Sequence, residues 1–139
     1  MSPPRRPLHW AWLGRRPYVP VWHQQRAIRE ALLRGEGTET LLLVEHEPVI
    51  TLGRRAAPAT ALRVPEPTLA GAGVEVHQVE RGGEATWHGP GQLTGYPLVR
   101  LATLAMDVPT FVAALEQAMI DFVSCRGVAC HRVPGRHGV

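Results

Sequence analysis

The side chains most suited to chemistry lie in one glycine-rich stretch, residues 80–97, which reads ERGGEATWHGPGQLTGYP. Arg81 stands before two glycines, and its guanidinium could hold a carboxylate, a phosphate or a backbone carbonyl. His88 could form a hydrogen bond with a reacting carbonyl, or it could fix the stretch by hydrogen bonds. Glycine tolerates positive φ and lets a ligand lie directly on the main chain. These features predict a binding surface.

Four further residues of the stretch are expected to shape it rather than to react: Thr86, Trp87, Gln92 and Tyr96. The hydroxyl and the amide can tie the loop to itself, and the two aromatic rings can form an apolar wall. The alternative for Arg81 is a surface ion pair with Glu80 or Glu84. Its place beside the two glycines favours holding a ligand or anchoring the loop.

The sequence motifs offer little support for a nucleotide site or a metal site. Neither GxGxxG nor GxxxxGK[ST] occurs, and all fifteen basic residues are arginine, so no lysine is present. The spacing of Cys125, Cys130, His131 and His137 differs from that of structural zinc sites. Neither cysteine has a neighbouring lysine or helix N-terminus that would lower its thiol pKa. We expect no metal and no cofactor, and the remaining histidines, His9, His23, His46 and His77, are expected to be structural or exposed.

The elements that must position the stretch are read from hydrophobic periodicity and turn residues. Strands are expected at residues 9–13, 41–44, 49–52, 74–79, 96–101 and 128–133, and helices at 21–34 and from 108 to the glycine at 127. Asp107 is the expected N-cap of the second helix. Breaks are expected at residues 14–17 and 45–48, and a surface connection at 54–67. The pattern predicts a mixed α/β domain.

Composition narrows the class of protein. With 139 residues and a net charge of +3, the chain is expected to form one globular domain preceded by a flexible tail at residues 1–8. The arginines are scattered rather than gathered on one face, which argues against nucleic acid. No apolar run is long enough for a membrane span, and the N-terminus lacks the features of a secretory signal. Two cysteines fit a reducing compartment, so a cytoplasmic location is expected.

Residues 81–97, RGGEATWHGPGQLTGYP, resemble the signature of the lipoyl(octanoyl) transferases of lipoate biosynthesis. The segments LLLVEHEPVITLGR at 41–54 and YVPVWHQQ at 18–25 are similar to other parts of the same family. The resemblance runs in order from about residue 9 to residue 139. It implies the fold of the biotin and lipoate protein ligases, a mixed sheet with helices on one face.

The resemblance also implies an activity, partners and a site. The activity is transfer of an octanoyl group from octanoyl-acyl carrier protein to a lysine of lipoyl domains, in 2-oxoacid dehydrogenases and the glycine cleavage H protein. The implied acyl-site residues are Arg81, Gly82, Gly83, Glu84, Ala85, Thr86, Trp87 and His88. The implied loop-supporting residues are Gly89, Pro90, Gly91, Gln92 and Tyr96. The glycine pair would allow close approach, and His88 would face the reacting end.

The sequence departs from the family at its end. The catalytic lysine and the cysteine in a Pro-Cys-Gly setting, which follow Gly-Val in the family, do not follow Gly138 and Val139. Cys125 and Cys130 do not match that motif, so no catalytic residue is assigned in this chain. We expect a partial domain, truncated before the catalytic pair, that is inactive alone. The alternatives are an ATP-dependent lipoate or biotin protein ligase and a noncatalytic or split-subunit acyl-binding module.

Overall fold

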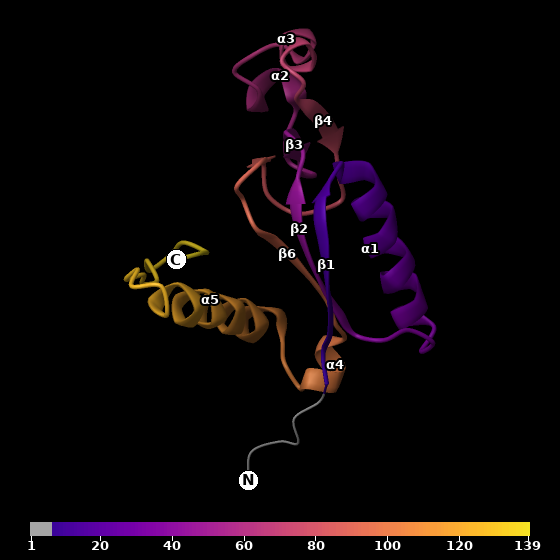
Figure 1. Ribbon diagram of the computed structural model, residues 1–139, viewed down its shortest axis with the longest axis vertical. Helices are drawn as coiled ribbons and strands as arrows, with labels where there is room; N and C mark the ends of the chain where they lie inside the picture. The colour runs from indigo at the N-terminus through magenta and orange to yellow at the C-terminus, as the bar shows by residue number, and fades with distance from the viewer. Residues whose placement is uncertain (1–6) are drawn as a thin grey trace. The chain divides into compact units, whose positions relative to one another are not determined.

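The computed structural model describes residues 7–139 (Figure 1). Of the flexible tail expected at residues 1–8, residues 1–6 lie outside the described part. The chain divides into two units, residues 1–99 and 100–139. The first carries the glycine-rich stretch and the second carries the long C-terminal helix. The expectation of one domain over residues 1–139 stays a prediction.

The first sheet has the strand order β1-β2-β6, built from β1 (His9–Arg16), β2 (Thr40–His46) and β6 (Thr94–Leu98). β2 pairs in parallel with β1 and antiparallel with β6. Helix α1 (Tyr18–Leu33) runs beside these strands (Figure 1). Every second residue of β2 from Leu42 onward is buried, ending at His46, which is 0% exposed. This alternation leaves the other face of β2 partly open, so the strand is not buried on both faces.

The two expected breaks occur, but both are shorter than predicted. β1 continues past Leu13 to Arg16, with a register irregularity between Trp12 and Arg15 that absorbs the positive φ of Gly14. β2 continues through Glu45 and His46, so the break is only Glu47 and Pro48. Both strands extend further than predicted because their additional residues pair with each other, Arg15 with Glu45 and Arg16 with His46.

The second sheet has the strand order β4-β3-β5, built from β3 (Val49–Leu52), β4 (Glu75–Gln78) and β5 (Ala85–His88). β3 pairs in parallel with β4 and antiparallel with β5. The connection expected at residues 54–67 contains a short helix, α2 (Pro58–Ala61), and its last two residues belong to the next helix, α3 (Glu66–Gly71). Tyr18, Val49 and Val79 form a buried apolar cluster between α1 and this sheet.

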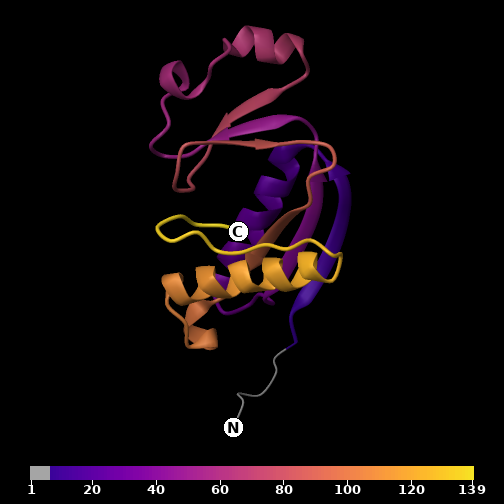
Figure 2. The same cartoon turned by 90° about the vertical axis from the view of Figure 1, so that its left-hand side faces the viewer.

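The second unit contains α4 (Leu101–Leu104) and α5 (Val108–Ser124). The predicted N-cap is confirmed, because the Asp107 side chain accepts a hydrogen bond from the Thr110 amide at 2.8 Å. The strand expected at residues 128–133 is wrong. That segment instead runs back along α5 (Figure 2), which has no free backbone ladder to pair with a strand. Arg132 and Gly138 hold it there through the Glu116 carboxylate, at 3.1 and 2.9 Å.

The expected mixed α/β class is confirmed by two sheets that each combine parallel and antiparallel pairing. Within residues 7–139 we find no helix with the length and apolarity that crossing a bilayer requires. The second unit carries both cysteines of the chain and none of the six strands. The glycine-rich stretch therefore belongs wholly to the first unit, where it supplies one strand to each sheet.

Candidate functional site

The glycine-rich stretch is not a continuous loop, because β5 and the start of β6 lie within it. Residues 89–93 connect the two strands, and Gly91 there has a φ of +83°. The Gln92 amide donates to the Gly89 carbonyl at 3.1 Å and closes the turn. Pro90 lies in the same turn. The expected role of these residues in supporting the stretch stays a prediction.

Arg81 is an anchor for the stretch. Its Nε and Nη2 both donate to the Thr51 hydroxyl, at 3.1 and 2.9 Å, and Nη2 also donates to the Thr51 carbonyl at 2.6 Å. Nη1 donates to the Gly82 carbonyl at 2.9 Å. No ion pair joins Arg81 to Glu80 or Glu84 within residues 7–139. Of the roles that the sequence left open, the geometry matches loop anchoring.

The end of β3 and the two glycines approach each other closely. A Cβ at Gly53 would lie 2.3 Å from the Gly83 carbonyl oxygen and 2.9 Å from that of Gly82. The Gly53 amide donates to the Glu84 carbonyl at 2.9 Å. Gly83 has a φ of +84°, which an L side chain rarely adopts. The close backbone contact therefore requires glycine at 53, and the positive φ favours glycine at 83.

Strand pairing divides the candidate acyl-site residues between two faces. Residues directly opposite each other in a sheet point to the same side. His88 pairs with Val49 and Thr86 with Thr51, on the face that contains the Arg81 anchor and the Tyr18 cluster. The other face carries two further pairs, Trp87 with Ile50 and Ala85 with Leu52. Residues 85–88 therefore cannot all line one cavity.

The face that carries His88 also contains a buried hydrogen-bonded chain. His46 Nδ1 lies 3.2 Å from the Arg16 carbonyl oxygen, which can only accept, so Nδ1 carries the proton. His46 Nε2 is 2.9 Å from the Tyr96 hydroxyl and accepts from it. The His46 ring lies 5.3 Å from the ring of Tyr18 and 5.8 Å from that of His88, centroid to centroid. Two histidines and two tyrosines thus meet at one place.

His88 is held in one orientation. Its Nδ1 donates to the Gln92 Oε1 at 2.6 Å, and the Gln92 amide nitrogen donates to the Trp87 carbonyl at 3.3 Å. Within residues 7–139, Nε2 of His88 has no hydrogen-bond partner. The ring can therefore present an unprotonated nitrogen to a substrate. The Thr94 hydroxyl also donates to Gln92 Oε1, at 3.5 Å. The side-chain hydrogen bonds within the stretch therefore involve mainly Gln92.

Burial sets the protonation of this cluster. It lowers the pKa of His46 below its ordinary value, and the nearby His88 lowers it further against the opposing Arg16 hydrogen bond. Burial, with the neighbouring Tyr18, also raises the pKa of the Tyr96 hydroxyl. Burial likewise raises the pKa of Tyr18. His46 and the two tyrosines are therefore neutral at pH 7, and the Tyr96 hydroxyl donates to His46 Nε2.

Sequence reasoning treated His46 as structural or exposed and did not place it beside His88. It is buried and structural, and its contact with the site is not predicted by the sequence because the break expected at residues 45–48 includes it. The available signal was the continuation of alternate burial from Leu42 and Val44. The sequence also does not predict the contact between Tyr18 and His77, whose rings stack at a centroid distance of 5.8 Å.

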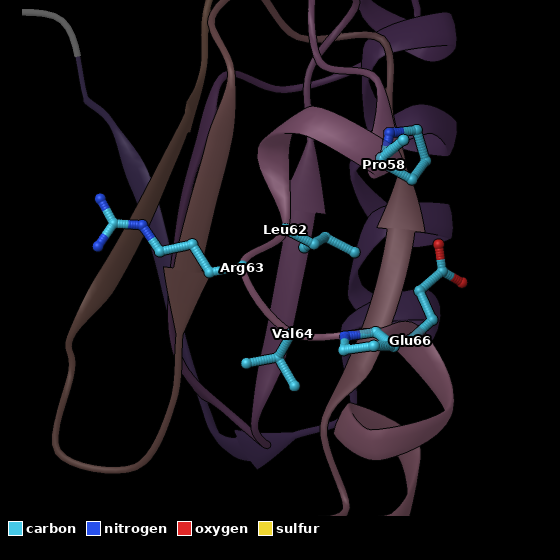
Figure 3. Close-up of a pocket in the computed structure, with 7 residues that line it drawn as sticks. Pro58, Leu62, Arg63, Val64 and Glu66 are labelled. Atoms are coloured by element: carbon cyan, nitrogen blue, oxygen red, sulfur yellow. The ribbon is translucent and has the colours of Figure 1, made fainter.

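Among the cavities of the described residues, three are lined by residues of the first unit. The first, of 460 Å³, is lined by residues 58, 59 and 62–66 (Figure 3). The second, of 360 Å³, has walls from Ile50, Ala85 and Trp87 together with residues 61–64 and 69. The third, of 740 Å³, lies along residues 66–77. Neither Arg81 nor His88 lines any of these three.

The two cysteines lie outside the glycine-rich stretch. Cys125 is exposed, Cys130 is partly buried, and both are free thiols. Both belong to the second unit. No group of three or more histidine, cysteine or carboxylate residues with a metal-binding arrangement occurs in the described part of the chain.

Residues 17–139 match the family described as the lipoyl protein ligase A/B catalytic domain. The chain belongs to this family. It is 45% identical, over 133 residues, to the octanoyltransferase of Rhodococcus jostii (strain RHA1), covering 96% of this chain and 48% of that protein. It is 40% identical, over 134 residues, to the octanoyltransferase of Thermobifida fusca (strain YX), covering 95% of this chain and 54% of that protein.

Solved structures agree with the fold. The T. acidophilum protein Ta0514 has a TM-score of 0.60 at 15% identity, covering 87% of this chain and 49% of that one. A lipoate-protein ligase A bound with ATP has a TM-score of 0.57 at 15% identity, covering 88% and 47%. The expected biotin and lipoate ligase-like fold is thereby confirmed. The chain spans about half the length of the curated relatives it matches.

Proposed function

We propose that this chain is the acyl-binding portion of an enzyme that transfers an octanoyl group from octanoyl-acyl carrier protein to a lysine of lipoyl domains. The observation that carries the proposal is the 45% identity to an octanoyltransferase over 96% of the chain. The accepting lipoyl domains are those of 2-oxoacid dehydrogenases and the glycine cleavage H protein. Two free thiols suit a reducing compartment, which supports a cytoplasmic location.

In this proposal the face that carries His88 receives the reacting end of the acyl thioester. The unpartnered Nε2 of His88 can accept a hydrogen bond there, with its proton held on Nδ1 by Gln92. Arg81 acts as a positioning residue, because its donors are used by Thr51 and Gly82. Burying the octanoyl chain would contribute about 0.8 kcal/mol per methylene, several kcal/mol in total.

The chain itself supplies no catalytic pair in this proposal. Residues 1–139 contain no lysine, and neither Cys125 nor Cys130 stands in a Pro-Cys-Gly setting. We therefore expect the 139-residue chain to bind octanoyl-acyl carrier protein without forming a thioester or an octanoylated lipoyl domain. Mass spectrometry of the chain and of the lipoyl domain after incubation measures both products. Transfer by the isolated chain would contradict the assignment of an acyl-binding portion.

Binding is tested by NMR with the acylated and the unacylated carrier protein. We expect octanoyl-acyl carrier protein to shift the His88 and Thr86 signals, and the unacylated carrier to leave them in place. His88→Gln should weaken the response, whereas His23→Gln, at an exposed position on α1, should not. Equal binding by the two variants would exclude His88 from the acyl site. Release of pyrophosphate from ATP with octanoate would instead favour a ligase.

A further inference from the structure

A crevice lies on the face of the second sheet opposite His88. Its floor is formed by Ile50 of β3 with Ala85 and Trp87 of β5, and its cover by Leu62, Val64 and Leu69. The 360 Å³ cavity shares residues 62–64 with the neighbouring 460 Å³ cavity, so the two are adjacent lobes. Figure 3 shows the residues that line the 460 Å³ lobe. No residue on the His88 face lines either lobe.

The Trp87 side chain forms one wall of the crevice, and its ring packs against the backbone of Gly89. A Cβ on Gly89 would meet the indole ring at 2.7 Å, so the ring lies directly across this glycine. Trp87 nevertheless remains 49% exposed, and Val64 is 41% exposed. The crevice therefore presents an aromatic and an aliphatic wall to solvent.

One cation borders this apolar surface. Arg63 lines both lobes, is exposed, and makes no hydrogen bond or ion pair within residues 7–139. Glu66, the one acidic residue of either lobe, lines only the 460 Å³ lobe, and its side chain extends away from that of Arg63 (Figure 3). An unpaired guanidinium beside an apolar slot is complementary to a ligand with one negative head and an alkyl tail.

We propose that this crevice binds a medium-chain carboxylate, with its alkyl chain against Ile50, Leu69 and Trp87 and its carboxylate at Arg63. A volume of 360 Å³ lies near the lower end of the range for ligand sites, which suits a single short chain rather than a nucleotide. The inference goes beyond the proposed transfer, because it concerns a separate face and a free acid rather than a thioester.

The test is a titration of the ¹⁵N-labelled chain with sodium octanoate, followed through the indole N–H signals. The Trp87 signal is assigned by its loss in Trp87→Phe. We expect this signal to shift in a saturable way. Trp10 and Trp12, which are exposed on β1, serve as internal controls for nonspecific binding and should not shift. Butanoate should bind more weakly, because fewer methylene groups are buried.

Two variants test the head group. Arg63→Gln should weaken octanoate binding about two- to fivefold, as expected for an exposed ion pair. Val64→Asp should weaken it about fivefold by placing a like charge at the crevice. Both positions are exposed, so folding should be retained. The matched control is Arg55→Gln, which removes the same charge from an exposed residue that lines none of the three cavities.

Three outcomes would overturn the inference. Octanamide binding as tightly as octanoate would exclude recognition of the charge. Equal losses of octanoate affinity in Arg63→Gln and Arg55→Gln would indicate that the net charge of the protein attracts octanoate without a specific contact at Arg63. Octanoate shifts at His88 with Trp87 unmoved would place the acid on the other face, leaving the proposed acyl transfer intact while removing this site. Conversely, a Trp87 response with no His88 response to octanoyl-acyl carrier protein would support this site and count against the proposed transfer.

Discussion

Arg81 is bound to Thr51 through three hydrogen bonds, two to the hydroxyl and one to the carbonyl, at 3.1, 2.9 and 2.6 Å. Thr51 lies in the centre of β3 and is 1% exposed. The arginine that precedes the glycine pair therefore joins the glycine-rich stretch to the second sheet. This contact explains why the backbone of Gly82 and Gly83 can lie so close to Gly53.

The first prediction concerns this anchor. Thr51→Val keeps the side-chain shape but removes the hydroxyl that accepts from two guanidinium nitrogens. We expect the free energy of unfolding to fall by about 1–3 kcal/mol, because the donors lose a buried partner. Urea denaturation measures this change in the free energy of unfolding. Thr68→Val, at an exposed position in α3, is the control and should change stability by less than about 0.5 kcal/mol. Equal effects of the two substitutions would show that Thr51 does not anchor the stretch.

A second prediction concerns the Tyr96 hydroxyl. Tyr96→Phe leaves the fully buried Nε2 of His46 without its donor, so we expect a loss of about 1–3 kcal/mol in thermal or urea unfolding. The matched control is Tyr18→Phe, because the Tyr18 hydroxyl makes no hydrogen bond within residues 7–139. A loss in the control as large as in Tyr96→Phe would argue that ring packing, rather than the hydrogen bond, is what matters.

A third prediction follows from the lowered pKa of His46. Because the folded pKa lies below the unfolded one, the unfolded chain takes up a proton first as pH falls. The stabilising effect is complete above the ordinary histidine value and is lost as pH falls through that value toward the folded pKa, by at most about 1.4 kcal/mol per pH unit. The groups facing His46 are Tyr18, His88 and Tyr96.

Urea titrations between pH 7.5 and 5 would measure this dependence (roughly the range in which histidine titrates). His46→Gln should reduce the slope of stability against pH, while His9→Gln, at an exposed position on β1, should preserve it. An unchanged slope in His46→Gln would assign the dependence to the other histidines.

A fourth prediction concerns the second unit. The Gly138 amide, together with Arg132, lowers the pKa of Glu116, so the carboxylate is charged at neutral pH and holds residues 128–139 along α5. Glu116→Gln should weaken this contact and accelerate tryptic cleavage after Arg136. Asp121→Asn, on the same helix but paired only with Gln117, is the control. Equal cleavage rates would mean that other contacts hold the segment.

The sequence by itself determined the type of the main elements and the family. Residues 108–124 repeat apolar side chains with helical spacing after a capping aspartate, and residues 49–52 end at a glycine, so local preferences and tertiary structure agree there. The run RGGEATWHGPGQ contains enough uncommon residues in fixed order to indicate the family without a structure.

Tertiary structure alone decided which of those residues share a face. Strand pairing set His88 opposite Val49 and Trp87 opposite Ile50, on opposite sides of one sheet. The His88 ring also lies 5.8 Å from that of His46, which belongs to the other sheet. The tertiary structure also converted Arg81 from a candidate ligand-binding cation into an anchor on Thr51, 30 positions away. The strand expected at residues 128–133 did not form because a strand requires a partner ladder, and the neighbour of that segment is a helix. Strand pairing and the Arg81–Thr51 contact join residues that are far apart in the sequence, and local periodicity does not encode such contacts.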